Sequence, residues 1–107
     1  MGSFKLVESN GKWRFSLLAG NNEPILQSET YESKVAAQNG IESVRKNAVR
    51  EGAFEVKEAK NGESYFVLKS TNGKVVGQSE MYSSDSGCKN GIESVKKNAP
   101  DAEVKEI

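Results

Sequence analysis

The chain carries two copies of one sequence unit, and this duplication constrains its fold more than any other feature. Residues Asn39–Ala48 return as Asn90–Ala99 with one change, Arg45 in place of Lys96. Two further pairs of segments repeat at the same offset: Gln27–Tyr31 with Gln78–Tyr82, and Asn10-Gly11 with Asn61-Gly62. A shared offset means that the whole unit is repeated, so the chain should form two similar halves.

Chain length and the repeat together predict a single domain. A unit of about fifty residues buries too little apolar surface to be safely stable alone, so the two copies should share one core. We therefore predict one domain over residues 1–107. It comprises repeat one at 4–50, repeat two at 53–99, and a C-terminal strand at 102–107 that should pair with the first repeat.

The charge balance argues against nucleic acid and membrane as partners. Fifteen basic residues balance fifteen acidic ones, and the two signs are interspersed, so no broad electrostatic footprint is expected. No stretch approaches membrane-spanning length, and patterned sequence begins at Phe4 rather than after a signal peptide. One cysteine cannot form an internal disulfide, which fits a reducing compartment. We expect a cytoplasmic protein.

Alternating segments predict three strands in each repeat. The first strands, Phe4–Glu8 and Phe54–Glu58, are each followed by Asn-Gly, and a hairpin at this dipeptide places both turn residues at positive φ. The second strands should span Trp13–Ala19 and Ser64–Ser70, and the third Ile25–Ser28 and Val75–Gln78. Phe15, Leu17, Phe66 and Leu68 should face the helices, whereas Arg14, Ser16, Leu18, Tyr65, Val67 and Lys69 should face away.

After these strands the hydrophobic period changes to that of a helix. Apolar residues recur with helical spacing, and a serine precedes each stripe as a candidate N-cap. The first stripe is Ala37, Ile41, Val44 and Ala48 after Ser33, and the second is Cys88, Ile92, Val95 and Ala99 after Ser84. Both stripes run through an Asn-Gly dipeptide, yet we predict continuous helices. Gly40 lies at the edge of its stripe, and close backbone approach of a neighbouring helix or strand should offset the cost of a helical glycine there.

These elements predict an α+β fold. Two tandem βββα repeats and a C-terminal strand would form a single antiparallel sheet with two helices on one face and pseudo-two-fold symmetry.

The repeated motifs resemble those of the YegP-like family of small, uncharacterised bacterial proteins. Asn-Gly-Ile-Glu-Ser-Val-(Arg/Lys)-Lys-Asn, preceded by Gln-Ser-Glu-x-Tyr, occurs twice, and the resemblance covers essentially the whole chain. It implies β3-α-β units joined in one sheet, with the strand after each helix exchanged between units. It also implies dimers for single-unit members, so we expect this tandem chain to be a monomer with an internal pseudo-dimer. The resemblance implies no catalytic residues.

The absence of histidine argues against an enzyme. It removes Ser-His-Asp and Cys-His systems and imidazole metal sites, and the single cysteine excludes structural zinc. No phosphate-binding loop opens either predicted helix. We therefore predict no catalytic residues, no cofactor and no metal.

Several noticeable side chains have structural interpretations. Cys88 occupies the position of Ala37 in the apolar stripe, so it should be a small buried hydrophobe. Tyr31 and Tyr82 should pack against the helix starts with their hydroxyls bonded to backbone. Trp13 should be partly buried in the core.

The outward helix faces are the first candidate interaction surface. Glu-Lys pairs at i, i+4, Glu42 with Lys46 and Glu93 with Lys97, are expected on solvated faces. The repeated face consists of Asn39, Glu42, Ser43, Lys46, Asn90, Glu93, Ser94 and Lys97. Recent duplication is the simpler explanation of this identity; the functional hypothesis is a symmetric docking site for a protein partner.

The open sheet face is the second candidate surface. Arg14, Tyr65 and Lys69 could stack bases and hold phosphates, but one tyrosine and a neutral chain make a weak signal. Leu18 and Val67 on the same face suggest an association patch instead. We therefore predict a non-catalytic protein-interaction module with an unknown partner, with weak single-stranded nucleic-acid binding as the alternative and catalysis as the least supported reading.

Overall fold

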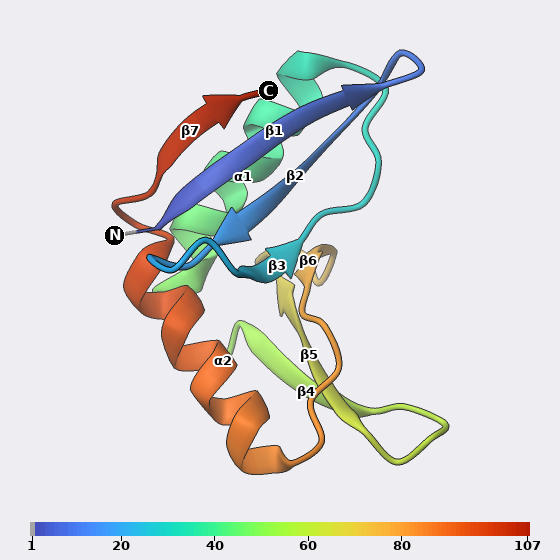
Figure 1. Cartoon of the computed structure of the whole chain (residues 1–107), viewed down its shortest axis with the longest axis vertical. Coiled ribbons are helices and arrows are strands. Elements are labelled where there is room, and N and C mark those ends of the chain that lie inside the picture. The colour runs from blue at the N-terminus through green and yellow to red at the C-terminus, as the bar shows by residue number, and fades with distance from the viewer. Residues whose placement is uncertain (1) are drawn as a thin grey trace.

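The computed structural model describes residues 2–107, which form one sheet and two helices (Figure 1). The first repeat contains β1 (Ser3–Ser9), β2 (Lys12–Leu18), β3 (Pro24–Gln27) and α1 (Lys34–Ala48). The second contains β4 (Phe54–Glu58), β5 (Ser64–Lys69), β6 (Val75–Gln78) and α2 (Asp85–Asn98), and β7 (Glu103–Glu106) follows. The predicted α+β architecture is confirmed.

The sheet has seven strands in the order β4-β5-β6-β3-β2-β1-β7. Neighbours are antiparallel except β1 and β7, which are parallel. The expectation of a wholly antiparallel sheet is therefore wrong at this one pair. The C-terminal strand does pair with the first repeat, but it arrives through α2, and a strand that returns through a helix can run parallel to its neighbour.

In the middle of the sheet, β3 of the first repeat pairs with β6 of the second at one residue pair, Gln27 with Gln78. These glutamines occupy equivalent positions in the two copies of the repeated segment. A pairing between equivalent residues places the pseudo-two-fold axis between β3 and β6. The two halves of the sheet therefore extend outward from a centre that both repeats share (Figure 1).

The core lies between the sheet and the helices and is common to both repeats. Phe4, Phe15 and Phe66 are fully buried in one cluster with the helix stripes. Helix α1 packs on β2 and also on β5 and β6, and α2 packs on β5 and also on β2 and β3. Each helix thus covers strands of both repeats, which explains how two small units form one buried interior.

The predicted Asn-Gly turn is present in only one repeat. Asn10 (φ 54°) and Gly11 (φ 78°) both lie in the left-handed region, as expected. The prediction is wrong for the second hairpin, where Gly62 (φ 85°) adopts that region but the asparagine before it does not. Residues 59–63 form a longer turn there, closed by Ala59 N donating to Glu63 O at 2.8 Å. Residues 59–63 connect the register pair Glu58 and Ser64, whereas residues 9–12 connect the equivalent pair Glu8 and Trp13. The second connection is therefore one residue longer, which favours the longer turn.

Both helices are continuous and capped as predicted. Ser33 Oγ accepts from Ala36 N at 3.1 Å, and Ser84 Oγ accepts from Gly87 N at 3.0 Å. The expected close approach of a neighbouring backbone at Gly40 is wrong, because the side chain of Tyr31 occupies this space instead. An ideal Cβ on Gly40 would lie 2.5 Å from Tyr31 Oη.

Tyr31 and Tyr82 each belong to an aromatic stack that fixes the ring against a helix. Tyr31 stacks on Phe15 with ring centroids 6.0 Å apart, and its backbone bridges Trp13, which is partly buried as predicted. Tyr82 repeats the stack on Phe66 at 6.2 Å. The expectation that the hydroxyls bond backbone is wrong within residues 2–107. The hydroxyl ends of the rings lie against the middle of the helices, where Gly40 and Gly91 leave room, and the Tyr82 ring also lies beside Gly87 at the start of α2.

Three further expectations can be compared with the structure. Cys88 is fully buried, as predicted. Val67 is only 3% exposed, so it cannot contribute to an association patch; its register partners Glu55 and Gln78 flank it with long side chains. The helix ion pairs have i, i+3 spacing rather than i, i+4. They join Glu42 to Arg45 at 2.6 Å and Glu93 to Lys96 at 3.4 Å.

Candidate functional site

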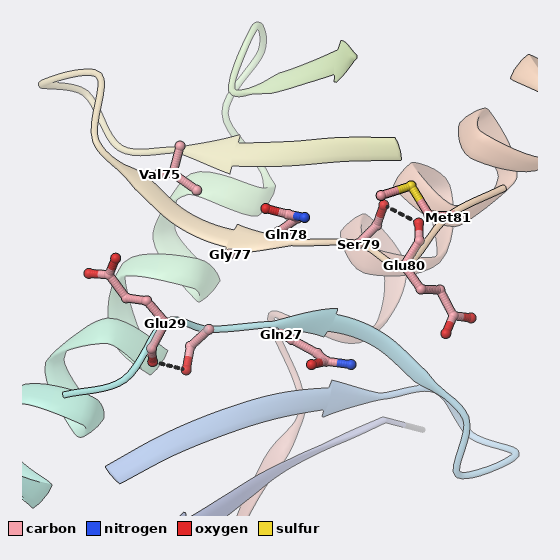
Figure 2. A pocket seen from close by; sticks show the side chains of 9 residues that line it. Gln27, Glu29, Val75, Gly77, Gln78, Ser79, Glu80 and Met81 are labelled. Carbon is pink, nitrogen blue, oxygen red and sulfur yellow. Dashed lines mark hydrogen bonds between the residues drawn. The ribbon is translucent and has the colours of Figure 1, made fainter. Parts of the chain in front are cut away.

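A groove of about 530 Å³ lies where β3 and β6 meet (Figure 2). The strands are joined there by only one residue pair, so the chains diverge on either side of it. The groove is lined by Gln27, Ser28, Glu29, Val75, Gly77, Gln78, Ser79, Glu80 and Met81. It lies on the face away from the helices, because Gln27 alternates with the core residue Leu26.

Polar side chains are arranged symmetrically in this groove. Gln27 and Gln78 lie on adjacent strands at its centre, and Glu29 and Glu80 lie toward opposite ends (Figure 2). All four are exposed. The amides supply donors and acceptors and the carboxylates supply acceptors only, so the groove presents a hydrogen-bonding surface with a negative charge at each end.

The serines of the groove are used in holding the sheet together. Ser28 Oγ accepts from Phe15 N at 2.9 Å and donates to Glu29 O at 2.7 Å. Ser79 does the same with Phe66 N at 2.9 Å and Glu80 O at 2.8 Å. These bonds fix the backbone on which the glutamates stand, so the spacing of the polar groups is set by the fold.

Apolar exposure breaks the symmetry of the groove. Val75 is 42% exposed and Met81 44% exposed, and both lie in the second repeat. Their counterparts in the first repeat are Pro24 and Thr30, of which neither lines the groove. One side of the groove therefore offers apolar contact area that the other side does not.

The groups with shifted pKa values lie outside this groove. Burial raises the pKa of Tyr31 and of Tyr82, with smaller contributions from Glu29 and Glu80, and burial also raises the pKa of the Cys88 thiol. A hydrogen bond from Lys69 lowers the pKa of Glu55. Among residues 2–107 no three acidic, histidine or cysteine side chains gather into a metal-binding group.

The predicted helix-face residues form two separate sets, one on each helix. Asn39, Glu42 and Lys46 are exposed on α1, as are Asn90, Glu93 and Lys97 on α2. Ser43 and Ser94 are used internally, since the amides of Asn47 and Asn98 donate to their oxygens. The α1 set borders a hollow of about 280 Å³ that it shares with the β5–β6 turn at Ser70 and Thr71.

The predicted sheet-face residues do not form one patch. Arg14 lies on β2, whereas Tyr65 and Lys69 lie on β5, with β3 and β6 between them. Lys69 is paired with Glu55. Arg14 and Tyr65 are equivalent positions in the two repeats, so the two-fold relation places them apart.

Sequence reasoning missed the groove although it identified the segments that line it. The repeated Gln-Ser-Glu-x-Tyr segment contributes the central glutamines and the flanking glutamates. Its identity in both copies was the available signal. What was missing was the β3–β6 pairing, which brings the two copies together.

Comparisons with known proteins match the whole chain. The family described as a domain of unknown function, DUF1508, matches residues 8–55 and again 59–106. A UPF0339 protein of Pseudomonas aeruginosa is 55% identical over 87% of this chain and 84% of its own length. The UPF0339 protein YegP of Yersinia pestis is 44% identical over 100% of this chain and 96% of its own length.

Solved structures share the fold. The solution NMR structure of yegP from E. coli, a protein of unknown function, superposes with a TM-score of 0.92 at 45% identity, covering 98% of this chain and 91% of that one. The NMR structure of a UPF0339 protein from Shewanella oneidensis also gives 0.92, at 42% identity over 98% of this chain and 90% of that one. In residues 2–107 neither helix is long and apolar enough to cross a membrane.

Proposed function

Since the chain belongs to the UPF0339 family, with two DUF1508 repeats, we propose that it is a non-catalytic protein-interaction module that binds its partner in the groove between β3 and β6. The resemblance to the YegP-like proteins is confirmed by these relatives, whose names assign no activity.

The composition of the groove is the observation that carries this proposal. Two amides, two carboxylates and the exposed side chains of Val75 and Met81 line one open surface. A mixture of apolar area and groups that can donate and accept hydrogen bonds is typical of protein interfaces. Methionine adapts readily to the shape of a partner, which suits a binding surface.

Charge supports a protein over a single-stranded nucleic acid. Glu29 and Glu80 place negative charge in the groove that lies between Arg14 and Lys69. Phosphates that bridged these cations would have to pass the carboxylates, and Lys69 is already paired with Glu55. Nucleic-acid affinity depends on cations that are free to contact phosphates, so this distribution favours a neutral or basic protein segment.

The helix faces are a second candidate surface for a protein partner. Lys46 and Lys97 are exposed at equivalent positions and, within residues 2–107, hold no ion pair. Glu42 is less suitable for substitution, because it contacts Arg45, which also donates to Ala102 O near the C-terminal strand.

Affinity capture from a lysate of the cells in which the protein naturally occurs tests the proposal, with matched surface variants as controls. Wild-type protein should retain a partner that resists nuclease, and the double variant Glu29→Lys/Glu80→Lys should lose it at unchanged melting temperature. Lys46→Glu/Lys97→Glu changes the same number of charges on the helix faces and should retain it. Loss only with the helix-face variant would move the site to the helices, and loss on nuclease treatment would replace the proposal with nucleic-acid binding.

A further inference from the structure

The two edge strands of the sheet, β7 and β4, differ in how they relate to the repeats. At one end β7 lies beside β1. At the other end β4 pairs with β5 alone, and no strand within residues 2–107 lies on its outer side (Figure 1). Chain connectivity explains the difference: the strand after α2 is free to cover β1, whereas the strand after α1 is β4 itself and belongs to the second repeat.

The outer edge of β4 presents unpaired backbone groups. Ala53 O accepts from Lys69 N at 2.9 Å, so Ala53 faces β5, and alternation turns the N–H and C=O of Phe54, Val56 and Glu58 outward. At the opposite end the equivalent outward group is used, since Leu6 O accepts from Ile107 N at 2.9 Å.

Apolar side chains are also more exposed at the β4 edge than at the β1 edge that β7 covers. Leu6 and Val56 occupy equivalent positions, each paired in register with a core phenylalanine of the next strand. Leu6 beside β7 is 1% exposed, whereas Val56 is 46% exposed. The β4 edge therefore has apolar surface where the other edge has a covering strand.

A cation is placed at each edge in the same way. Arg45 lies over the ring of Phe4 at 5.5 Å and donates from Nη2 to Ala102 O at 2.5 Å, which holds the chain entering β7. Lys96 occupies the equivalent position over Phe54 at 5.9 Å. Its ammonium group can donate to a backbone carbonyl of a strand added beside β4.

Charges at the edges indicate what such a strand would carry. Lys34 pairs with Glu106 of β7 at 2.5 Å. The equivalent of Lys34 is Asp85, whose Oδ1 accepts from Ser64 Oγ of β5 at 2.8 Å, so the second repeat carries the opposite charge at this position and a long basic side chain would be needed to reach it. By strand register Glu55, which also pairs with Lys69, takes the position held by Lys5 on β1, opposite Lys105. Both changes favour basic residues in the strand that adds to β4.

From this pattern we propose that the outer edge of β4 binds an extended segment of a partner protein as an additional parallel strand. The register of β7 on β1 assigns its residues: an apolar residue opposite Phe54, a basic residue opposite Glu55, and a basic residue opposite Val56 that reaches Asp85. Backbone bonds to the edge supply affinity and these side chains supply specificity. This site is separate from the β3–β6 groove, so either can fail without the other.

Peptides copied from β7 provide the test. The full chain, isotope-labelled for NMR, is titrated to millimolar concentration with the capped peptide 102–107 in its native sequence or with Glu106→Lys. The substituted peptide should shift the amide signals of Phe54, Val56 and Glu58 and slow their hydrogen exchange. It should bind about two- to fivefold more tightly than the native peptide, the effect of one exposed ion pair.

Two variants of the chain make the result decisive. Asp85→Lys should reverse the order of the two peptides, and Val56→Pro, which removes an outward N–H at an edge position that tolerates proline, should abolish binding. Thermal melting checks that each variant is folded. Signals of β4 that do not move, or equal affinity for both peptides, would overturn the proposal. So would concentration-dependent dimerisation through β4 without peptide, since a second copy would then occupy the edge.

Discussion

Alanine substitution at the helical glycines tests whether the tyrosine stacks determine where glycine is required. Helix α2 contains Gly87 and Gly91, one turn apart. At Gly87 the nearest atoms to an added Cβ are 3.4 Å away, and the equivalent residue in α1 is already Ala36. At Gly91 the Cβ would overlap Tyr82 Oη and lie 2.8 Å from its Cζ.

These contacts give opposite signs for the two substitutions. Alanine gains about 1 kcal/mol over glycine in a helix interior, so Gly87→Ala should stabilise by about 0.5–1 kcal/mol. Gly91→Ala gains the same term but overpacks the stack, which costs about 1–3 kcal/mol. Tyr82 cannot move away freely, since its backbone bonds Ser64 at 2.8 and 2.7 Å. We expect a net loss of up to about 2 kcal/mol at Gly91.

Urea unfolding followed by circular dichroism measures both effects. The midpoint should rise for Gly87→Ala and fall for Gly91→Ala at unchanged slope. Gly40→Ala in α1 should behave like Gly91→Ala, because Tyr31 and Phe15 crowd it in the same way. A stabilised Gly91→Ala or Gly40→Ala protein would refute the argument that the ring fixes the glycine.

Three further predictions concern other parts of the molecule. Deleting residues 102–107 should cost about 2–4 kcal/mol of unfolding free energy, because it exposes the apolar β1 edge and removes strand hydrogen bonds; a truncated chain with an unchanged melting temperature would contradict this. Asn22 (φ 68°) occupies the position that Gly73 (φ 83°) has in the second repeat, and both lie in the left-handed region. Asn22→Gly should therefore stabilise the protein and Gly73→Asn destabilise it, each by about 0.5–1 kcal/mol. Variants that melt at the wild-type temperature would count against a requirement for the left-handed conformation. Burial raises the pKa of Tyr31 and Tyr82. Above about pH 9–10 these hydroxyls therefore stay protonated in the folded chain while they lose their protons in the unfolded chain, and the free energy of unfolding should fall as pH rises. A urea midpoint that does not change with pH would argue against the burial of the two tyrosines.

The elements of this fold are predictable because each has a local signal. The change of hydrophobic period located both helices, and the serines before the stripes located their starts. The helical state of the Asn-Gly dipeptides is predictable because the apolar stripe continues through Gly40. The turn of the second hairpin is not predictable in this way, because one added residue changes the turn without changing the Asn-Gly dipeptide.

Properties that depend on distant contacts were not predictable. The groove exists because Gln27 meets Gln78, a pairing that no local pattern of either segment specifies. The i, i+3 pair of Glu42 follows from where Arg45 lies over Phe4 and beside Ala102, a contact made across the whole chain. The direction of β7 likewise depends on the path through α2.

The pseudo-two-fold axis between Gln27 and Gln78 has an evolutionary consequence. In an assembly of two identical chains every mutation appears twice, so both halves must tolerate it and neither can specialise. Here one gene encodes both halves, and a mutation changes one of them alone. Arg45 and Lys96, Lys34 and Asp85 are positions where the halves have already diverged. Covalent linkage thus lets natural selection act separately on two surfaces that descend from one ancestor.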